Sequence, residues 1–405
     1  MADLLIRGLA QLATPGPGVL PLRGRALADL DVIDDAYLLC RAGRIESVGR
    51  MRDLPALADE VDELDGSGLC AMPGLVDCHT HPAFGGDRVE EFSLRAAGAT
   101  YEELHAAGGG ILSTVNATRG LDEDALLDRV RLHARWMLVH GTTTWEGKSG
   151  YGLDRDTELA SLRSIRRTGG SSTWLGAHAV PPDHADADEY LSYALAEVLP
   201  TAAQLADAAD VFLERGAFDA TQARRYLEAC RDAGLALRLH GDQFTESGAV
   251  PLAIELAARS VDHLEATGPA GVAALAASDV TAVLLPASAL FLDRPMPPAR
   301  ALVDAGAAIA VATDFNPGSS FTTSLPLVCS LACMLLHLSP AEALSAVTAN
   351  AAHVLGQGSR TGRLAPGLAA DVVLLDAPDW RYLAYHLAGD VVSTVVQGGE
   401  PVYRR

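Results

Sequence analysis

Two histidines separated by a single residue give the first indication of chemistry in this chain. His79 and His81 follow a short apolar run, and Pro82 comes directly after them. Because residues two apart in an extended strand point to the same face, both imidazoles can reach one metal ion. Arg88 follows on a glycine-containing loop, so a guanidinium lies near the end of the same strand. The pair predicts half of a metal site.

The middle of the chain indicates the scaffold that would position these side chains. Short β-type runs alternate there with helical stretches rich in Ala, Leu, Glu and Arg. This alternation predicts a parallel sheet, and eight such units predict a closed (β/α)8 barrel. The eight runs lie around residues 75–78, 142–146, 173–177, 210–213, 236–239, 260–262, 282–285 and 308–312.

Both ends of the chain have a different pattern. Short apolar runs alternate there with Gly, Pro and Asp, which predicts strands joined by turns. The strands are expected at residues 3–6, 36–41, 44–48, 370–376 and 391–397. We therefore expect an α/β protein in which residues 71–358 form the barrel, while residues 1–70 and 359–405 together build a small β-sandwich domain.

Functional side chains of such a barrel gather at the carboxyl ends of its strands. The third predicted strand ends at His178, the fifth at His240, the sixth at His263 and the eighth at Asp314. With the pair on strand one, four strands supply imidazole at the same end and a fifth supplies a carboxylate. Chance placement of 12 histidines among 405 residues would rarely give this arrangement. Strands two and four end near further polar residues, namely Glu146, Lys148, Tyr151 and Glu214.

Three imidazoles and one carboxylate suit Zn²⁺ or Fe²⁺, with one position open for water. An ion held in this way lowers the pKa of bound water toward about 7. Asp314 can contact the ion and accept the proton of that water. His263 is placed to polarise a carbonyl group or to return a proton to a leaving nitrogen. This chemistry hydrolyses an amide, an amidine or a related C–N bond.

The histidine pair, the strand-five and strand-six histidines and the strand-eight aspartate resemble the amidohydrolase superfamily. More narrowly, several segments resemble the imidazolonepropionase family, whose members open an imidazolone ring during histidine degradation. These segments span residues 73–88, 98–101, 108–111, 148–152, 176–181, 261–265 and 314–319, so that the resemblance covers nearly the whole chain. The histidine pair is typical of the superfamily, whereas Lys-Ser-Gly-Tyr-Gly and Asp-x-Asn-Pro-Gly are much narrower motifs.

The resemblance implies one metal ion, zinc or iron, held by His79, His81, His240 and Asp314, with His263 and Asp314 as the catalytic residues. It implies substrate contacts at Arg88, Tyr151, His178, Gln243, Asn316, Gly318 and Ser319. The substrate would be 4-imidazolone-5-propanoate and the product N-formimidoyl-L-glutamate. A guanidinium offers a bidentate partner for the carboxylate of this substrate, and a phenol can donate to it.

Two positions depart from the family pattern, and a third indicates how many metal ions the site would hold. Some members carry Glu where this chain has Gln243, and an amide cannot act as a base, so proton transfer would rest on Asp314 and His263. Gly241 is smaller than the expected alanine. Lys148 follows strand two, whereas a carbamylated lysine that bridges two metals comes from strand four, so one metal is expected.

Two other functions fit parts of this pattern. A relative with the same fold and metal could act on another cyclic amide, such as a hydantoin or a dihydropyrimidine, or could deaminate an aminopurine. Arg88 and Tyr151 favour a carboxylated substrate instead. A catalytically dead relative could bind a metabolite as a sensor, but this chain keeps every expected ligand and acid or base.

Composition indicates which partners the protein can bind and in which compartment it works. The chain has 52 acidic and 31 basic residues, a net charge of −21, which should repel nucleic acid and anionic membranes. The longest apolar segment, residues 327–338, is shorter than the roughly 20 residues that span a bilayer. The six cysteines form no Cys-x-x-Cys pair, which suits reduced thiols. We expect a cytoplasmic homodimer that acts on a small molecule, with a loop at Gly108–Gly110 that closes over the site.

Overall fold

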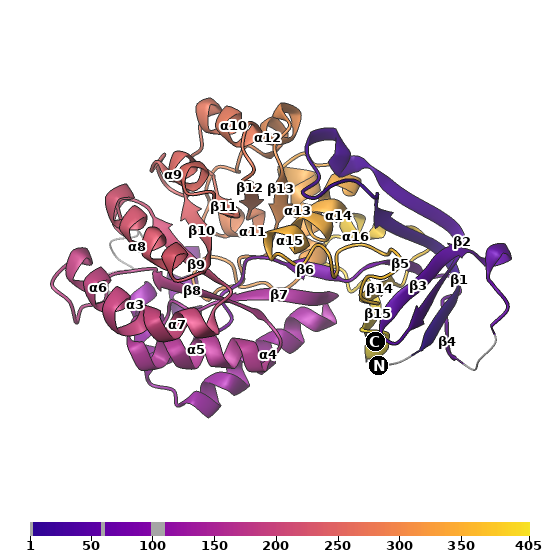
Figure 1. Ribbon diagram of the computed structural model, residues 1–405, viewed down its shortest axis with the longest axis horizontal. Coiled ribbons are helices and arrows are strands. Elements are labelled where there is room, and N and C mark those ends of the chain that lie inside the picture. Colours follow the sequence, from indigo (N-terminus) through magenta and orange to yellow (C-terminus); the bar gives the residue numbers. More distant parts are fainter. Residues whose placement is uncertain (1–2, 58–60, 99–109) are drawn as a thin grey trace.

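A computed structural model describes residues 3–57, 61–98 and 110–405 of the chain. Figure 1 shows two parts: a large body of strands surrounded by helices, and a smaller, strand-rich body that contains both chain termini. Each part is built around its own eight-stranded sheet. The predicted fold, a parallel barrel with a small β-domain made from both ends of the chain, is confirmed. The exact boundaries at residues 70/71 and 358/359 stay a prediction.

The large sheet is parallel, and each strand pairs with its neighbour in the sequence. Every predicted barrel strand is present, with bounds that differ by at most two residues. The strands are β6 (Leu75–Asp77), β7 (Thr142–Lys148), β8 (Ser171–Ala177), β9 (Ala208–Leu213), β10 (Ala236–Gly241), β11 (Ser260–His263), β12 (Thr281–Leu284) and β13 (Ile309–Val311). Most of their residues are buried, as expected for strands that are covered on both faces.

The segments that follow the first and the last barrel strand bring the sheet edges together. The amide of His81 donates to the carbonyl of Phe315 over 2.8 Å, and the amide of Asp314 donates to the carbonyl of His79 over 3.1 Å. These bonds join the loop after β6 to the loop after β13. Closure therefore places the two ends of the sheet, and the polar residues that follow them, against each other.

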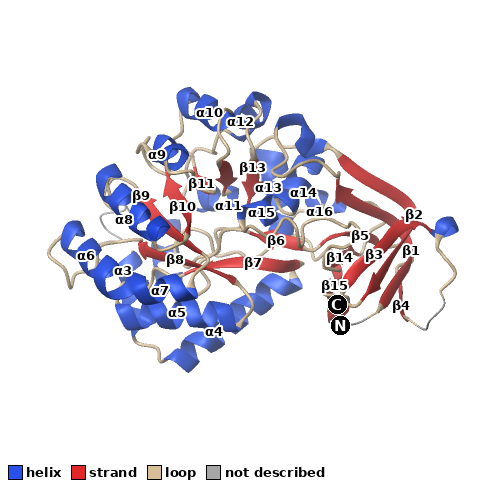
Figure 2. Ribbon diagram, viewed as in Figure 1, coloured by secondary structure: helices blue, strands red, loops and turns tan. Residues whose placement is uncertain are grey.

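Helices cover the outside of the barrel (Figure 2). Several of them begin at a capping side chain; for example, the Asp122 side chain accepts from the amide of Ala125 at the start of α4. The barrel helices are α1 (Val89–Ala96), α3 (Ile111–Arg119), α4 (Glu123–Val139), α5 (Arg155–Arg167), α6 (Ala187–Tyr193), α7 (Leu199–Leu205), α8 (Ala220–Asp232), α9 (Ala249–Glu255), α10 (Pro269–Ala276), α11 (Pro286–Phe291), α12 (Ala299–Ala305), α13 (Leu325–Leu335), α14 (Pro340–Ala346) and α15 (Ala349–Val354). A short helix, α16 (Tyr382–Tyr385), and three single turns, η1 (Gly24–Ala28), η2 (Met51–Asp53) and η3 (Ala194–Val198), complete the helical elements of the described residues.

The small sheet has the order β16-β15-β14-β5-β1-β2-β3, with β4 paired to β1, so the strands of the two chain ends meet where β14 pairs with β5. Its strands are β1 (Leu4–Pro15), β2 (Leu30–Arg41), β3 (Arg44–Arg50), β4 (Asp62–Asp65), β5 (Cys70–Pro73), β14 (Val372–Leu375), β15 (Val392–Gln397) and β16 (Glu400–Arg404). β1 runs past the predicted end at residue 6, because Gly8 adopts a φ of 70° and absorbs a register shift in the β1–β2 pairing.

Among the described residues, no helix is long and apolar enough to cross a membrane. The longest apolar segment forms α13, which packs its buried face against the rest of the barrel. The glycine run expected to close over the site falls mostly outside the described residues. Gly110 alone is described, and it precedes the first turn of α3.

Candidate active site

The four predicted ligands meet at the carboxyl end of the barrel. His79 and His81 follow β6, His240 lies near the end of β10, and Asp314 follows β13. Nε2 of His81 lies 3.3 Å from Nε2 of His79 and 3.3 Å from Nε2 of His240. Oδ1 of Asp314 lies 3.4 Å from Nε2 of both His79 and His81. All four side chains are buried.

This cluster fits a metal ion. Nδ1 of His79 contacts Asp262 and Nδ1 of His240 contacts Asp210, so each ring donates from Nδ1 and keeps its lone pair on Nε2. Lone pairs that face one another at 3.3 Å repel unless a cation lies between them. Two tetrahedral ligands that each lie about 2.0 Å from a zinc ion are about 3.3 Å apart, which matches the distance from His81 to each of the other two imidazoles. Among the described residues, His79, His81 and Asp314 form a group that could hold a metal, and His79 and His240 form another with His263.

Burial governs the charge of the imidazoles around this cluster. It lowers the pKa of His79 well below its ordinary value, that of His240 to about 4 and that of His178 to about 3. Neutral imidazole is the form that binds metals. Burial acts to raise the pKa of Asp314, yet contacts with His79 and His81 hold that pKa well below its usual range, so the carboxylate is ionised.

His263 lies at the end of β11, beside the cluster. The centroid of its ring is 5.4 Å from that of His240 and 5.7 Å from that of His79. Burial acts against its charged form, but Glu265, whose Oε1 lies 3.4 Å from Nδ1 of His263, raises the pKa. His263 has a φ of 83° and Asp314 a φ of 53°. Both predicted catalytic residues thus adopt the left-handed region that side chains rarely occupy, as often happens at active sites.

Two further predicted residues lie beside His81. The ring of His178, which follows β8, stacks on His81 with a centroid distance of 5.5 Å, and Tyr151 lies 5.2 Å from His178. Nδ1 of His178 donates to the Gly150 carbonyl over 2.9 Å, so Nε2 is its accepting nitrogen. Burial raises the pKa of Tyr151, which keeps the phenol protonated as a donor.

Arg88 precedes α1, and its guanidinium is held from two sides. Nε donates to Oε2 of Glu91 over 2.9 Å, and Nη2 donates to the same carboxylate. On the other side Nη1 lies against Gly318, where an added Cβ would come within 2.3 Å of that nitrogen. Arg95 donates from Nη2 to the Gly318 carbonyl over 3.1 Å. The small size of Gly318 therefore makes room for Arg88.

Asn316 and Ser319 lie on the loop after β13 that also carries Asp314. The amide of Asn316 donates from Nδ2 to the Asp314 carbonyl and to the Ser319 hydroxyl, each over 2.7 Å. Its Oδ1 accepts from the backbone amides of Gly318 and Ser319, each over 2.8 Å. The Asn316 side chain is thus used to shape its own loop, and contact of Asn316 and Ser319 with substrate stays a prediction.

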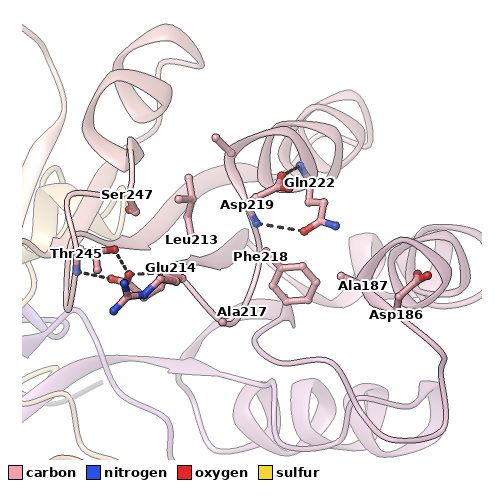
Figure 3. Close-up of a pocket in the computed structure, with 13 residues that line it drawn as sticks. Asp186, Ala187, Leu213, Glu214, Ala217, Phe218, Asp219, Gln222, Thr245 and Ser247 are labelled. Atoms are coloured by element: carbon pink, nitrogen blue, oxygen red, sulfur yellow. Dashed lines mark hydrogen bonds between the residues drawn. The ribbon is translucent and has the colours of Figure 1, made fainter.

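Gln243 is buried on the loop after β10, and Glu214 holds that loop. Oε2 of Glu214 accepts from the amides of Phe244 and Thr245 over 2.8 and 3.2 Å. Figure 3 shows the contact of Glu214 with Thr245 at the edge of a cavity of about 560 Å³ that is lined by residues of the loops after β9 and β10. The predicted residue Glu214 is therefore a loop anchor next to Gln243.

Sequence reasoning missed three carboxylates at this site, namely Asp210, Asp262 and Glu91. The first two contact the Nδ1 atoms of His240 and His79, and the third holds Arg88. A charged residue inside a short apolar strand is a usable signal for such a role, because an unpaired buried carboxylate is costly. Asp210 and Asp262 both show this signal. Glu91 lies in an ordinary polar helix and shows none.

Comparison with known proteins places the chain in a family. Residues 95–403 match the amidohydrolase family. A protein from Rubrobacter xylanophilus named imidazolonepropionase is 58% identical over 98% of this chain and 97% of its own length. A protein of the same name from Chloroflexus aggregans is 45% identical over 99% of this chain and 98% of its own length.

Solved structures share the fold at low identity. E. coli guanine deaminase superposes with a TM-score of 0.74 at 15% identity, covering 100% of both chains. An adenosine deaminase from Xanthomonas campestris with bound zinc gives a TM-score of 0.72 at 19% identity, covering 99% of this chain and 92% of the other. The family match and the full-length identity together show that the chain belongs to the amidohydrolase family and, within it, to the imidazolonepropionases.

Proposed function

We propose that this protein hydrolyses 4-imidazolone-5-propanoate to N-formimidoyl-L-glutamate. In this reaction the oxygen of water joins the ring carbonyl carbon, the bond from that carbon to the ring nitrogen breaks, and the nitrogen takes a proton. The former carbonyl carbon becomes a carboxylate that stays bonded to its neighbouring ring carbon. The proposal rests on the family and on the arrangement of the site.

One observation carries the choice of substrate. Arg88 lies against Gly318. Gly318 belongs to the loop after β13, which also supplies Asp314 to the metal cluster. Tyr151 connects the two features, because its ring lies 6.0 Å from His81 and Arg88 is among the charges that act on its pKa. A guanidinium and a phenol beside a metal site suit a ring with a carboxylate tail.

His79, His81, His240 and Asp314 would hold one ion, and both Zn²⁺ and Fe²⁺ accept this donor set. When bound, the ion supplies a water of lowered pKa and a Lewis acid for the carbonyl.

The protein groups have separate roles in the reaction. Asp314 is ionised and can take the proton of the attacking water, with Oδ2 near the Ser319 hydroxyl at 3.4 Å. His263, paired with Glu265 through Nδ1, offers Nε2 to the ring carbonyl. Neutral His178 accepts from a ring N–H through its own Nε2. Gln243 has no basic atom, so it contributes hydrogen bonds only.

The test uses enzyme as purified and an Arg88→Met variant, each assayed with imidazolonepropionate and with an imidazolone that lacks the propionate. Wild type should strongly prefer the carboxylated ring, and the variant should lose about 100-fold of that preference, since a charge-assisted bidentate pair is removed. Arg129→Met is the control, because Arg129 is partly exposed and donates to the Gly86 carbonyl nearby. An unchanged preference in Arg88→Met would refute the substrate assignment.

Chelation tests the metal part separately. Removal of the ion should abolish turnover, and zinc or iron added back should restore it, with the metal content measured by mass spectrometry. Turnover that continues in fully demetallated protein would refute the metal site.

We also propose that the protein works in the cytoplasm as a homodimer. The six cysteines form no Cys-x-x-Cys pair, which suits reduced thiols in a reducing compartment. Met334 and Tyr385 are exposed on α13 and α16, which pack together and could contact a second subunit. Sedimentation at micromolar concentration would distinguish a dimer from a monomer.

A further inference from the structure

Two of the metal-binding histidines are each supported by a buried carboxylate. Oδ2 of Asp262 lies 2.6 Å from Nδ1 of His79. Oδ1 of Asp210 lies 3.0 Å from Nδ1 of His240 and also accepts from the backbone amide of His240 over 3.2 Å. Such contacts fix which nitrogen carries the proton and how the ring is turned.

A single lysine connects these two carboxylates. Nζ of Lys148 donates to Oδ2 of Asp210 over 2.7 Å and lies 3.9 Å from Oδ2 of Asp262. Lys148 comes from β7, Asp210 from β9 and Asp262 from β11. The ammonium therefore lies inside the barrel, between side chains of alternate strands.

Lys148 is itself held in place by a further buried carboxylate and, through it, by an arginine. It donates to Oε1 of Glu146 over 2.8 Å, and the same oxygen accepts from Nη1 of Arg238 over 3.0 Å. Arg238 also donates to the carbonyl of Cys78, the residue before His79, over 2.9 Å. All of these charged side chains are buried, with exposed fractions of 0–2%.

The balance of charge explains why a lysine is needed at this point. Asp210 and Asp262 are two carboxylates buried in one barrel interior, and each must stay an acceptor for an Nδ1–H group. Like charges in such a place repel strongly, because no water screens them. An ammonium between them removes that repulsion and leaves both oxygens directed at the rings.

We propose that Lys148 is a positioning residue for the metal centre, which acts through Asp210 and Asp262 to orient His240 and His79. This inference rests on the metal ligands of the proposed function. It gives the lysine a role in metal retention, although the partners of its ammonium are carboxylates rather than ligand nitrogens.

The experiment compares metal-loaded wild type with Lys148→Met, a variant of similar length without the charge. Metal per chain is measured first, and then the rate at which the metal passes to an excess of a chromogenic chelator. Lys148→Met should release its metal about 10- to 100-fold faster, the range known for supporting residues of metal ligands. In steady-state assays kcat should fall while KM stays near the wild-type value, because the substrate contacts are intact.

Arg238→Met is the matched control. It removes a buried cation from the same network, but Arg238 hydrogen-bonds to Glu146 and to backbone carbonyls rather than to Asp210 or Asp262. Both variants should unfold at lower temperature than wild type, and Lys148→Met should release metal much faster than Arg238→Met, which reaches a ligand only through the Cys78 carbonyl. Equal acceleration in the two variants would mean that loss of any buried charge loosens the site, and this would overturn the proposal.

Asp210→Asn provides an independent test that does not depend on folding of the lysine variant. Alone, it should accelerate metal release, and combined with Lys148→Met it should accelerate release no further. If Asp210→Asn released its metal at the wild-type rate, or if the two substitutions had additive effects on that rate in the double variant, the proposal would be refuted. Wild type that binds no metal would instead refute the metal site on which the proposal rests.

Discussion

Arg88, the proposed partner of the substrate carboxylate, has one edge of its guanidinium occupied by Glu91. The Glu91 carboxylate also accepts from Arg95 over 3.3 Å and from the backbone amide of Gly110 over 2.8 Å. Glu91 thus gathers donors from α1 and from the start of α3. With Nε and Nη2 engaged, Arg88 is held against Gly318 and keeps Nη1 for a further partner.

Glu91→Gln should therefore weaken substrate binding more than catalysis. The amide keeps the shape of the side chain but loses the charge-assisted bonds, each of which contributes about 1.5–3 kcal/mol. We expect KM for imidazolonepropionate to rise about tenfold with kcat nearly unchanged, measured by steady-state kinetics. The exposed neighbour Glu90, changed to Gln, is the control. An unchanged KM in Glu91→Gln would show that Arg88 needs no such support.

At the scale of elements, Gly241 explains how closely α9 packs on β10. A Cβ built on Gly241 would lie 2.0 Å from the Cβ of Ala249, the first residue of α9. The chain departs from the expected alanine at this position, and the structure shows that Ala249 fills the space. Because His240 precedes Gly241, the same contact also determines where a predicted ligand lies.

Gly241→Ala should destabilise the fold by about 1–3 kcal/mol, because the strand and the helix must separate to admit the methyl group. Ala249→Gly in the same chain should recover most of that loss by returning the space. Urea unfolding of both single variants and the double variant measures the coupling. A double variant less stable than Gly241→Ala would contradict this explanation.

At the scale of the whole molecule, Asn350 joins the N-terminal segment to the barrel. Its Oδ1 accepts from the amide of Leu22 over 2.7 Å, and its Nδ2 donates to the carbonyls of Leu22 and Ile309, each over 2.8 Å. Leu22 lies between β1 and β2 of the small sheet, and Ile309 begins β13. One buried side chain therefore links the two parts of the protein.

Asn350→Leu keeps the volume of the side chain but leaves three buried backbone groups without this partner. Each such group costs about 1–3 kcal/mol, so the free energy of unfolding should fall by about 3 kcal/mol or more. Glu63→Ala, which removes an exposed ion pair with Arg7, should change it by less than about 1 kcal/mol. If denaturant unfolding showed the same loss of free energy of unfolding in both variants, Asn350 would not be a specific link between the two parts of the protein.

Most of the fold was predictable because its signals are local. Each barrel strand is a short apolar run, and the alternation with helices specifies a parallel barrel whatever the details of packing. The cluster of candidate metal ligands was predictable for the same reason, since the barrel brings all strand ends to one face. The ends of β1 and β2 were not, because Gly8 permits a bulge where the pattern indicated a stop.

By itself the sequence determined the barrel, the small sheet made from both chain ends, and the residues that meet at the strand ends. Only the tertiary structure decided which groups support them. His79 and Asp262 are 183 positions apart in the chain, and Lys148 and Asp210 are 62 apart. No local pattern records such a pair, because the contact arises only when closure of the barrel brings separate strands together. The direction of each side chain inside that closed, water-free interior then decides which charges meet.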